Sequence, residues 1–413
     1  MRGTERPTRV LAGLAAFALA GAFSLDARPA HADNCQTPLT STCINDDNLW
    51  PHAGSSHFLT IGGTETAMRD EVGFGFYASY LSRPIVLTTN SGGSPTNDYV
   101  VDNQVNGSFL FSYGVSNRLE LDVVVPVTLS QTGTGSDPLT GGTTGLPTSG
   151  VRDVRLGFAY ALVPRARVGG ENAGSDRREV VRPSVWAMTA RFEISAPTGD
   201  TNGFGSDGYA VWSPSLAADY RRGSWFGGAE VGLRIRRTEE LQGARVGSQA
   251  FVGLGLGRDL LPHEWLSVVA EAYALPTFSE QHTITAPPET IGTVSSPNGQ
   301  YIVPAEWMLS VRTAPFFGGD LQVQAGGGGS IPFGSEPPIT NPRFRFSLSV
   351  RYAPVGHDSD GDGVLDRDDK CPFVHGLAGN PAGEGCPASA DHEQVDLTGD
   401  GASPKPSPVP RTP

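Results

Sequence analysis

The stretch Arg343–Tyr352 limits the fold of this chain more than any other, because its side chains alternate strictly between apolar and polar. Side chains of a β-strand point alternately to its two faces. One face here would be apolar and the other rich in arginine and serine: Phe344, Phe346, Leu348, Val350 and Tyr352 against Arg343, Arg345, Ser347, Ser349 and Arg351. Such a strand fits either a half-buried sheet in water or a membrane barrel.

Eleven further segments show alternation of this kind, with lengths near those that a tilted strand needs to cross a bilayer. They are 71–82, 105–116, 118–129, 151–163, 185–196, 211–221, 224–236, 246–258, 265–275, 306–315 and 320–330. Beyond the N-terminus, no run reaches the roughly 18 apolar residues of a membrane-spanning helix. We therefore predict an all-β protein, an antiparallel transmembrane β-barrel of about 12 strands over residues 71–353.

The connections between these segments favour the barrel over a soluble sandwich, because long and short ones alternate. Outer-membrane barrels have long loops outside and short periplasmic turns. The long ones are 83–104, 130–150 and 276–305, the short ones are 116–118, 222–223 and 316–319, and 164–184 does not fit the alternation. An even number of strands returns the chain to its starting side, so we expect the outer membrane, with both termini periplasmic.

The polar faces of the predicted strands carry charges of both signs. In lipid, each basic group would cost roughly 2–4 kcal/mol, so these faces must line the lumen. The inward set is Glu120, Asp122, Asp153, Arg155, Arg191, Glu193, Asp219, Glu230, Arg234, Glu271, Arg312 and Arg345. Two interpretations stay open at this point: a hydrophilic pore, or a salt-bridged lumen that holds the barrel shut. The mixed signs predict no preference for anions or cations.

The first 32 residues have the pattern of an export signal. Basic residues precede an apolar core at 10–25, and Ala30-His31-Ala32 forms a cleavage site. An exported chain keeps disulfides, and of three pairings we favour the local ones, Cys35 with Cys43 and Cys371 with Cys386. Residues 33–70 are polar and irregular, and are either a periplasmic lead-in or a plug.

Residues 358–369 have the carboxylate spacing of a calcium loop. Six to eight oxygens surround Ca²⁺, and Gly363 permits the sharp turn. The predicted ligands are Asp358, Asp360, Asp362, the Val364 carbonyl, Asp366 and Asp369.

The formal net charge of −13 argues against a nucleic-acid partner.

This loop, with Cys371 and Pro372, resembles the thrombospondin type 3 repeat, which would cover 354–390 and precede an acidic, Pro-rich, disordered tail at 391–413. A signal peptide, a barrel and such a repeat, in that order, resemble OmpA-type outer-membrane proteins. The chain has no room for the peptidoglycan-binding domain that ends many of them. A second fragment, 396–401, holds only half a loop.

No catalytic motif is visible, since none of the eight histidines falls in a predicted strand and no phosphate loop or zinc spacing occurs. We therefore expect no enzyme. The predicted role is structural, or passive diffusion of small solutes. Two alternatives stay open: a secreted calcium-dependent adhesion protein, and a barrel transporter for hydrophobic compounds, whose strand-end motif the segment 195–200 resembles.

Overall fold

A computed structural model gives the structure of the chain. It describes residues 35, 41–91, 94–136, 145–165, 185–241, 244–261, 265–281, 300–316, 320–333, 339–354, 370, 371, 374, 376 and 385–387. The predicted signal peptide, the calcium loop 358–369 and the tail 391–413 lie outside the described residues. Those predictions, and the domain boundaries they set, stay predictions.

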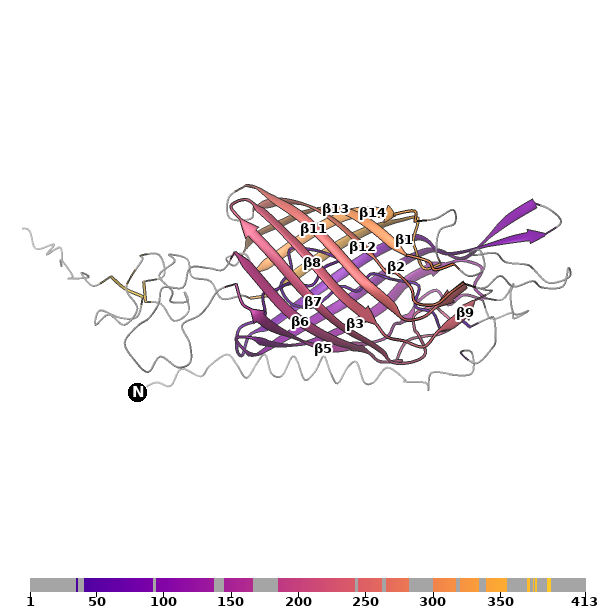
Figure 1. Ribbon diagram of the computed structural model, residues 1–413, viewed down its shortest axis with the longest axis horizontal. Helices are drawn as coiled ribbons and strands as arrows, with labels where there is room; N and C mark the ends of the chain where they lie inside the picture. The colour runs from indigo at the N-terminus through magenta and orange to yellow at the C-terminus, as the bar shows by residue number, and fades with distance from the viewer. Residues whose placement is uncertain are drawn as a thin grey trace, which may run out of the picture. The chain divides into compact units, whose positions relative to one another are not determined.

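Twelve antiparallel strands close into a barrel in which each pairs with its neighbours along the chain, and the first pairs with the last (Figure 1). They are β1 (Val72–Ser91), β2 (Ser94–Ser116), β3 (Leu119–Thr132), β5 (Arg155–Val163), β6 (Trp186–Ser195), β7 (Val211–Arg222), β8 (Trp225–Arg234), β11 (Gln249–Leu261), β12 (Leu266–Ala274), β13 (Ala305–Phe316), β14 (Leu321–Ser330) and β15 (Phe344–Tyr352). The closed, twelve-stranded antiparallel barrel is thus confirmed, and an open sandwich is excluded.

The barrel is apolar on its outside and charged on its inside. On β15, Phe346 is 60% exposed while its neighbour Arg345 is 0% exposed, and the strand alternates in this way along its length. A protein dissolved in water has the opposite arrangement. The exposed apolar side chains of β15 therefore form part of a lipid-facing surface, as the sequence predicted. Among the described residues, no helix has the length and apolarity that crossing a membrane requires.

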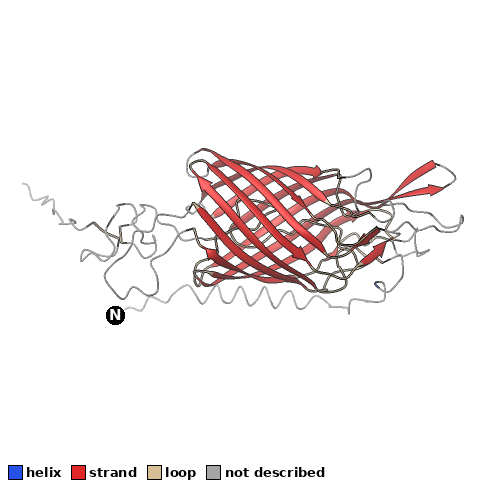
Figure 2. Ribbon diagram, viewed as in Figure 1, coloured by secondary structure: helices blue, strands red, loops and turns tan. Residues whose placement is uncertain are grey.

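Three features differ from the predicted strands, and all lie at one end of the barrel. β1 and β2 continue through 83–104, predicted to be a loop, as a ribbon that projects past the barrel (Figure 2). Arg83, with φ of 55°, and the register shifts beside it mark where the ribbon begins. Short strands also occur within two predicted loops: β4 (Gly150–Val151), β9 (Glu239–Leu241) and β10 (Ala244–Val246).

The two ends of the barrel carry different connections. At one end, here called the short-turn end, the connections are 117–118, 223–224, 262–265 and 317–320, together with the longer 164–185. The other, the long-loop end, carries the β1–β2 ribbon and the connections 133–154, 196–210, 235–248, 275–304 and 331–343. Successive connections of an antiparallel barrel alternate between ends, so this division follows from strand order alone.

Candidate functional site: the filled lumen

Charged side chains from most of the strands point into the lumen and are buried there. Twelve wall residues, six acidic and six basic, are each at most 4% exposed: Glu120, Asp122, Arg155, Arg191, Glu193, Glu230, Arg234, Glu271, Glu306, Arg312, Arg345 and Arg351. Two residues of the predicted inward set differ. Asp153 precedes β5 in a connection, and Asp219 on β7 forms an ion pair with Arg165.

Residues 41–68, here called the lumen segment, run through the barrel from one end to the other. At the long-loop end, Ser41 donates from its hydroxyl to Glu239, 2.7 Å away. At the short-turn end, Ala67 donates its N–H to Glu120, and the Asp70 N–H bonds to the Gly114 carbonyl near the β2–β3 turn. The described residues 41–68 therefore fill the lumen.

Wall carboxylates hold the segment mainly through its backbone N–H groups. Glu271 accepts from the N–H groups of Leu59 and Thr60 and from the Thr60 hydroxyl, at 2.6–3.1 Å. Glu230 accepts from the Gly62 N–H at 2.7 Å. Hydrogen bonds to a charged partner are worth about 1.5–3 kcal/mol each, more than neutral ones. The inward charges thus find partners in the segment itself.

Wall arginines hold the segment through its carbonyl groups in the same way. Arg234 donates to the Asn48 carbonyl and Arg155 donates to that of Pro51, at 2.8 and 2.7 Å. The guanidinium carbons of the same two arginines also lie over the Trp50 ring, 4.3 and 4.9 Å from its centroid, which is a cation–π arrangement. Buried arginines here therefore lie against a carbonyl and an aromatic face, which replace water.

His52, in the lumen segment, lies between two wall carboxylates. Its Nδ1 lies 2.7 Å from Glu193 and its Nε2 lies 3.4 Å from Glu230. Neutral imidazole has one N–H, whereas the cation has two. Facing a carboxylate at each nitrogen, His52 satisfies both only as the imidazolium cation. Arg155 also contacts Glu193, at 3.4 Å.

Two aspartates anchor the segment nearer the long-loop end. Asp46 forms an ion pair with Arg152 at 2.8 Å, and Asp47 forms one with Arg345 at 2.9 Å. Arg345 contacts Glu306 with a second nitrogen, also at 2.8 Å. Because removing water from charges is costly, these pairs are stable only with both partners present.

Phe58 lies against wall positions occupied by glycine. A Cβ atom at Gly228 would lie 2.5 Å from the Phe58 ring, and one at Gly255 would lie 2.4 Å from it, so any side chain at either position would collide with the ring. Phe58, Ile61, Phe226 and Val269 form a buried apolar cluster at this place. The two glycines of β8 and β11 thus form an aromatic-sized niche in an otherwise polar lumen.

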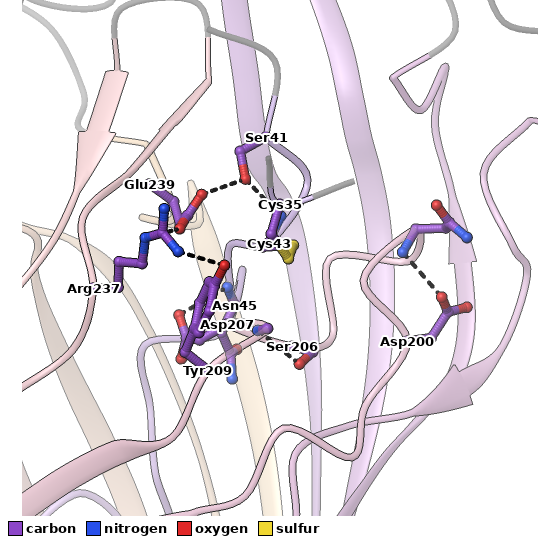
Figure 3. Close-up of a disulfide and its surroundings, with 12 residues drawn as sticks. Cys35, Ser41, Cys43, Asn45, Asp200, Ser206, Asp207, Tyr209, Arg237 and Glu239 are labelled. Atoms are coloured by element: carbon purple, nitrogen blue, oxygen red, sulfur yellow. Dashed lines mark hydrogen bonds and ion pairs between the residues drawn. A yellow bond between two sulfur atoms is a disulfide. The ribbon is translucent and has the colours of Figure 1, made fainter. Parts of the chain in front are cut away.

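The long-loop end closes over the segment with an apolar cluster and a disulfide. Ile44 packs among buried side chains of the ribbon, of β9 and β10, and of the loops: Ile85, Leu87, Val100, Val101, Phe204, Leu241, Ala244, Val246 and Ile339. Cys35 and Cys43 are joined, with Cα atoms 5.3 Å apart, close to Gly208 (Figure 3). Gly208 has φ of 68°, and a Cβ there would lie 2.4 Å from the Cys35 sulfur, so both backbone and space require glycine.

The second disulfide, Cys371 with Cys386, also forms, with Cα atoms 5.1 Å apart. Both predicted pairings are therefore confirmed. The six predicted calcium ligands lie outside the described residues, so their arrangement stays a prediction. So does the expectation that the chain is not an enzyme.

Sequence reasoning did not find the partners that the lumen segment supplies. Asp46, Asp47 and His52 received no role, although the wall charges that Asp47 and His52 bind were predicted to point inward. The sequence did contain a usable signal. Twelve buried charged groups in a lumen need partners, and the polar segment directly before the first strand is the nearest part of the chain that could supply them.

Two cavities lined by described residues of the segment and the wall are small. One cavity, beside Trp50 and Arg155, has about 20 Å³, and another, beside Phe58 and Asp219, has about 10 Å³. Such volumes hold about one water molecule. Neither of these two cavities has room for a solute larger than water.

A closed barrel with an apolar exterior and charged interior defines the class: an outer-membrane β-barrel with a filled lumen. No protein-family model and no curated protein matches the chain. Among solved structures, it is similar to an outer membrane channel from Pseudomonas putida F1, at 16% identity over 70% of this chain and 98% of that one, with a TM-score of 0.44.

Two further structures are less similar. The NanC porin is 7% identical over 67% of this chain and 97% of its own, with a TM-score of 0.36. A FadL homologue from Pseudomonas aeruginosa is 11% identical over 76% and 98%, with a TM-score of 0.34. Likeness at this level assigns neither a solute nor an activity.

Proposed function

We propose that this chain is an outer-membrane channel kept closed by its own lumen segment. The observation that carries the proposal is that charged wall side chains bond to the backbone of that segment, which therefore occupies the path of any solute. A lumen lined with such charges and freed of the segment would be water-filled, as in porins. Passage of solutes then requires the segment to move, and a permanently open pore is not what the arrangement supports.

Conductance in planar bilayers tests this proposal. We expect the wild-type protein to be closed most of the time, and a variant lacking residues 44–66 to conduct steadily. Heat-dependent gel mobility shows whether both proteins contain a folded barrel. A folded deletion variant that conducts no better than the wild type would leave the barrel with a structural role only.

The aromatic niche favours a second candidate, a transporter for hydrophobic compounds. With Phe58 displaced, the wall would offer an apolar site formed by Gly228, Gly255, Phe226 and Val269. Uptake of labelled benzene and of a labelled sugar, by intact cells with and without the protein, distinguishes the two candidates. Faster uptake of benzene alone supports the transporter, and faster uptake of the sugar supports a polar channel.

We also propose that Asp358, Asp360, Asp362, the Val364 carbonyl, Asp366 and Asp369 bind one Ca²⁺. The spacing of these oxygens supports the site, and the disulfide of Cys371 follows it directly. Calorimetry with CaCl₂ is the test. Asp360→Ala and Asp369→Ala are expected to weaken binding at least tenfold, and Asp391→Ala, outside the loop, serves as the control. Equal binding by all four proteins would refute the site.

A further inference from the structure

The described residues nearest the two termini of the barrel unit lie at opposite ends of the barrel. Cys35 lies against Gly208, in the connection between β6 and β7 at the long-loop end. Ala353 donates its N–H to the Asp320 carbonyl, in the connection between β13 and β14 at the short-turn end. The sequence led us to expect both termini on one side of the membrane, whereas Cys35 and Ala353 lie at opposite ends of the barrel.

The lengths of the connections say which end faces outward. Four of the five connections at the short-turn end have between two and four residues, whereas the long-loop end carries the ribbon and the longer loops. In outer-membrane barrels the short turns face the periplasm. The end that holds Cys35 is then the outer one.

We infer that the chain carries its own N-terminal end through the lumen and displays it on the cell surface. Cys35 and residues 41–43 lie at the outer mouth, and Ala353 lies at the periplasmic end. The inference concerns orientation only, and holds whether or not the lumen ever conducts.

The contacts in the lumen explain how a barrel could accept such a passage. The wall binds the segment largely through backbone groups, such as the carbonyls of Asn48 and Pro51 and the N–H groups of Leu59 and Thr60. Backbone groups are the same in every polypeptide, so these contacts hold an extended peptide without regard to its sequence, while Asp46, Asp47, His52 and Phe58 are held through their side chains. The lumen is therefore a polypeptide-binding channel, and its occupant is this chain's own N-terminal end.

The distribution of amines gives a direct test on the wild-type protein. The chain has only two lysines, Lys370 and Lys405, and both follow the barrel. An amine-reactive reagent that cannot cross the outer membrane is applied to intact cells, and peptides are identified by mass spectrometry. We expect labelling of the mature N-terminal amine and none of the lysines. After permeabilisation, both lysines should label as well.

If the N-terminal amine is not labelled even after permeabilisation, a variant that carries an epitope at each end of the chain provides the test. An epitope on a 20-residue Gly/Ser spacer, roughly 25 Å in mean extension, is inserted between Asp33 and Asn34, and a second epitope follows Pro413. We expect protease added to intact cells to remove the first epitope and spare the second. Labelling or cleavage only at the C-terminal end would show the inverse orientation, and protection of both ends would place both termini in the periplasm. Either result overturns the inference.

Discussion

Replacing His52 by glutamine removes the basic side chain that lies between Glu193 and Glu230, while keeping much of its volume. Glutamine can donate to one carboxylate but carries no charge. Glu193 would keep Arg155 as a partner, whereas Glu230 would keep only the Gly62 N–H and the Ser215 hydroxyl. The variant therefore leaves a buried carboxylate without a counter-charge.

The contacts of His52 set the size of the effect. Its side chain is 12% exposed, and those of Glu193 and Glu230 are 4% and 1% exposed, so solvent screens the pairs little. Removing one partner of a buried ion pair costs about 3–5 kcal/mol. About 1.4 kcal/mol corresponds to a factor of ten in an equilibrium constant. We therefore expect the ratio of closed to open channels to fall by roughly two to three and a half powers of ten.

Single-channel recording measures that ratio as the fraction of time open. We expect His52→Gln to raise the open fraction by at least a hundredfold, and Glu230→Gln added to it to reverse part of the rise, because a neutral pair then replaces the unpaired carboxylate. Hydrogen exchange of the Gly62 amide reports the same opening without a bilayer. If His52→Gln folds and neither quantity changes, His52 does not hold the segment, and the ionic account of closure is wrong.

Three further variants test other parts of the structure. Leu348→Arg places a charge on the lipid face and is expected to lower the free energy of unfolding in vesicles by about 2–4 kcal/mol, while Asn202→Arg in an exposed loop is expected to change it little. Gly255→Ala is expected to expel the Phe58 ring and raise the open fraction, and to have little further effect in a Phe58→Ala background, because the collision is then gone. Burial, and secondarily the charge of Asp207, raises the pKa of Asp153 from 3.8 to about 6. Because the folded state then binds this proton more tightly than the unfolded state, protonation of Asp153 favours folding. The free energy of unfolding should therefore rise by at most about 3 kcal/mol as the pH falls from 7 to 4. Urea unfolding of Asp153→Asn should lack this part of the pH dependence.

The barrel was predictable because the alternation of apolar and polar residues along each strand reflects the two environments of that strand, lipid and lumen. On the glycine-rich β11, Val252, Leu254 and Leu256 alternate with glycines in the sequence, and they are 40%, 60% and 55% exposed. Each strand needs only its own alternation to be recognised, and connection lengths then place the strands in order. No long-range information was required for the twelve strands or for the charged interior.

The filling of the lumen was not predictable in the same way. Residues 41–68 form no regular strand or helix, so they have no periodicity to read. Their contacts with Glu271 and Arg155 use backbone atoms, which leave no mark on the sequence of the segment. The ribbon escaped notice for a related reason: 88–98 consists mostly of threonine, serine, asparagine, glycine and proline, a composition typical of loops.

The distribution of contacts also determines how the lumen can open. Ionic anchors include Asp46 and Asp47 near the long-loop end, His52 further in, and Glu65, which pairs with Arg165. The rest of the stretch from Leu59 to Ala67 is bonded largely through its backbone. A bond from a backbone N–H to a carboxylate survives most side-chain replacements, so no single substitution removes that part of the closure. A substitution at an anchor therefore shifts the equilibrium between closed and open states, whereas steady conduction requires the whole segment to be absent. Graded opening in the variants, with full conductance only in the deletion, is the pattern that this arrangement demands.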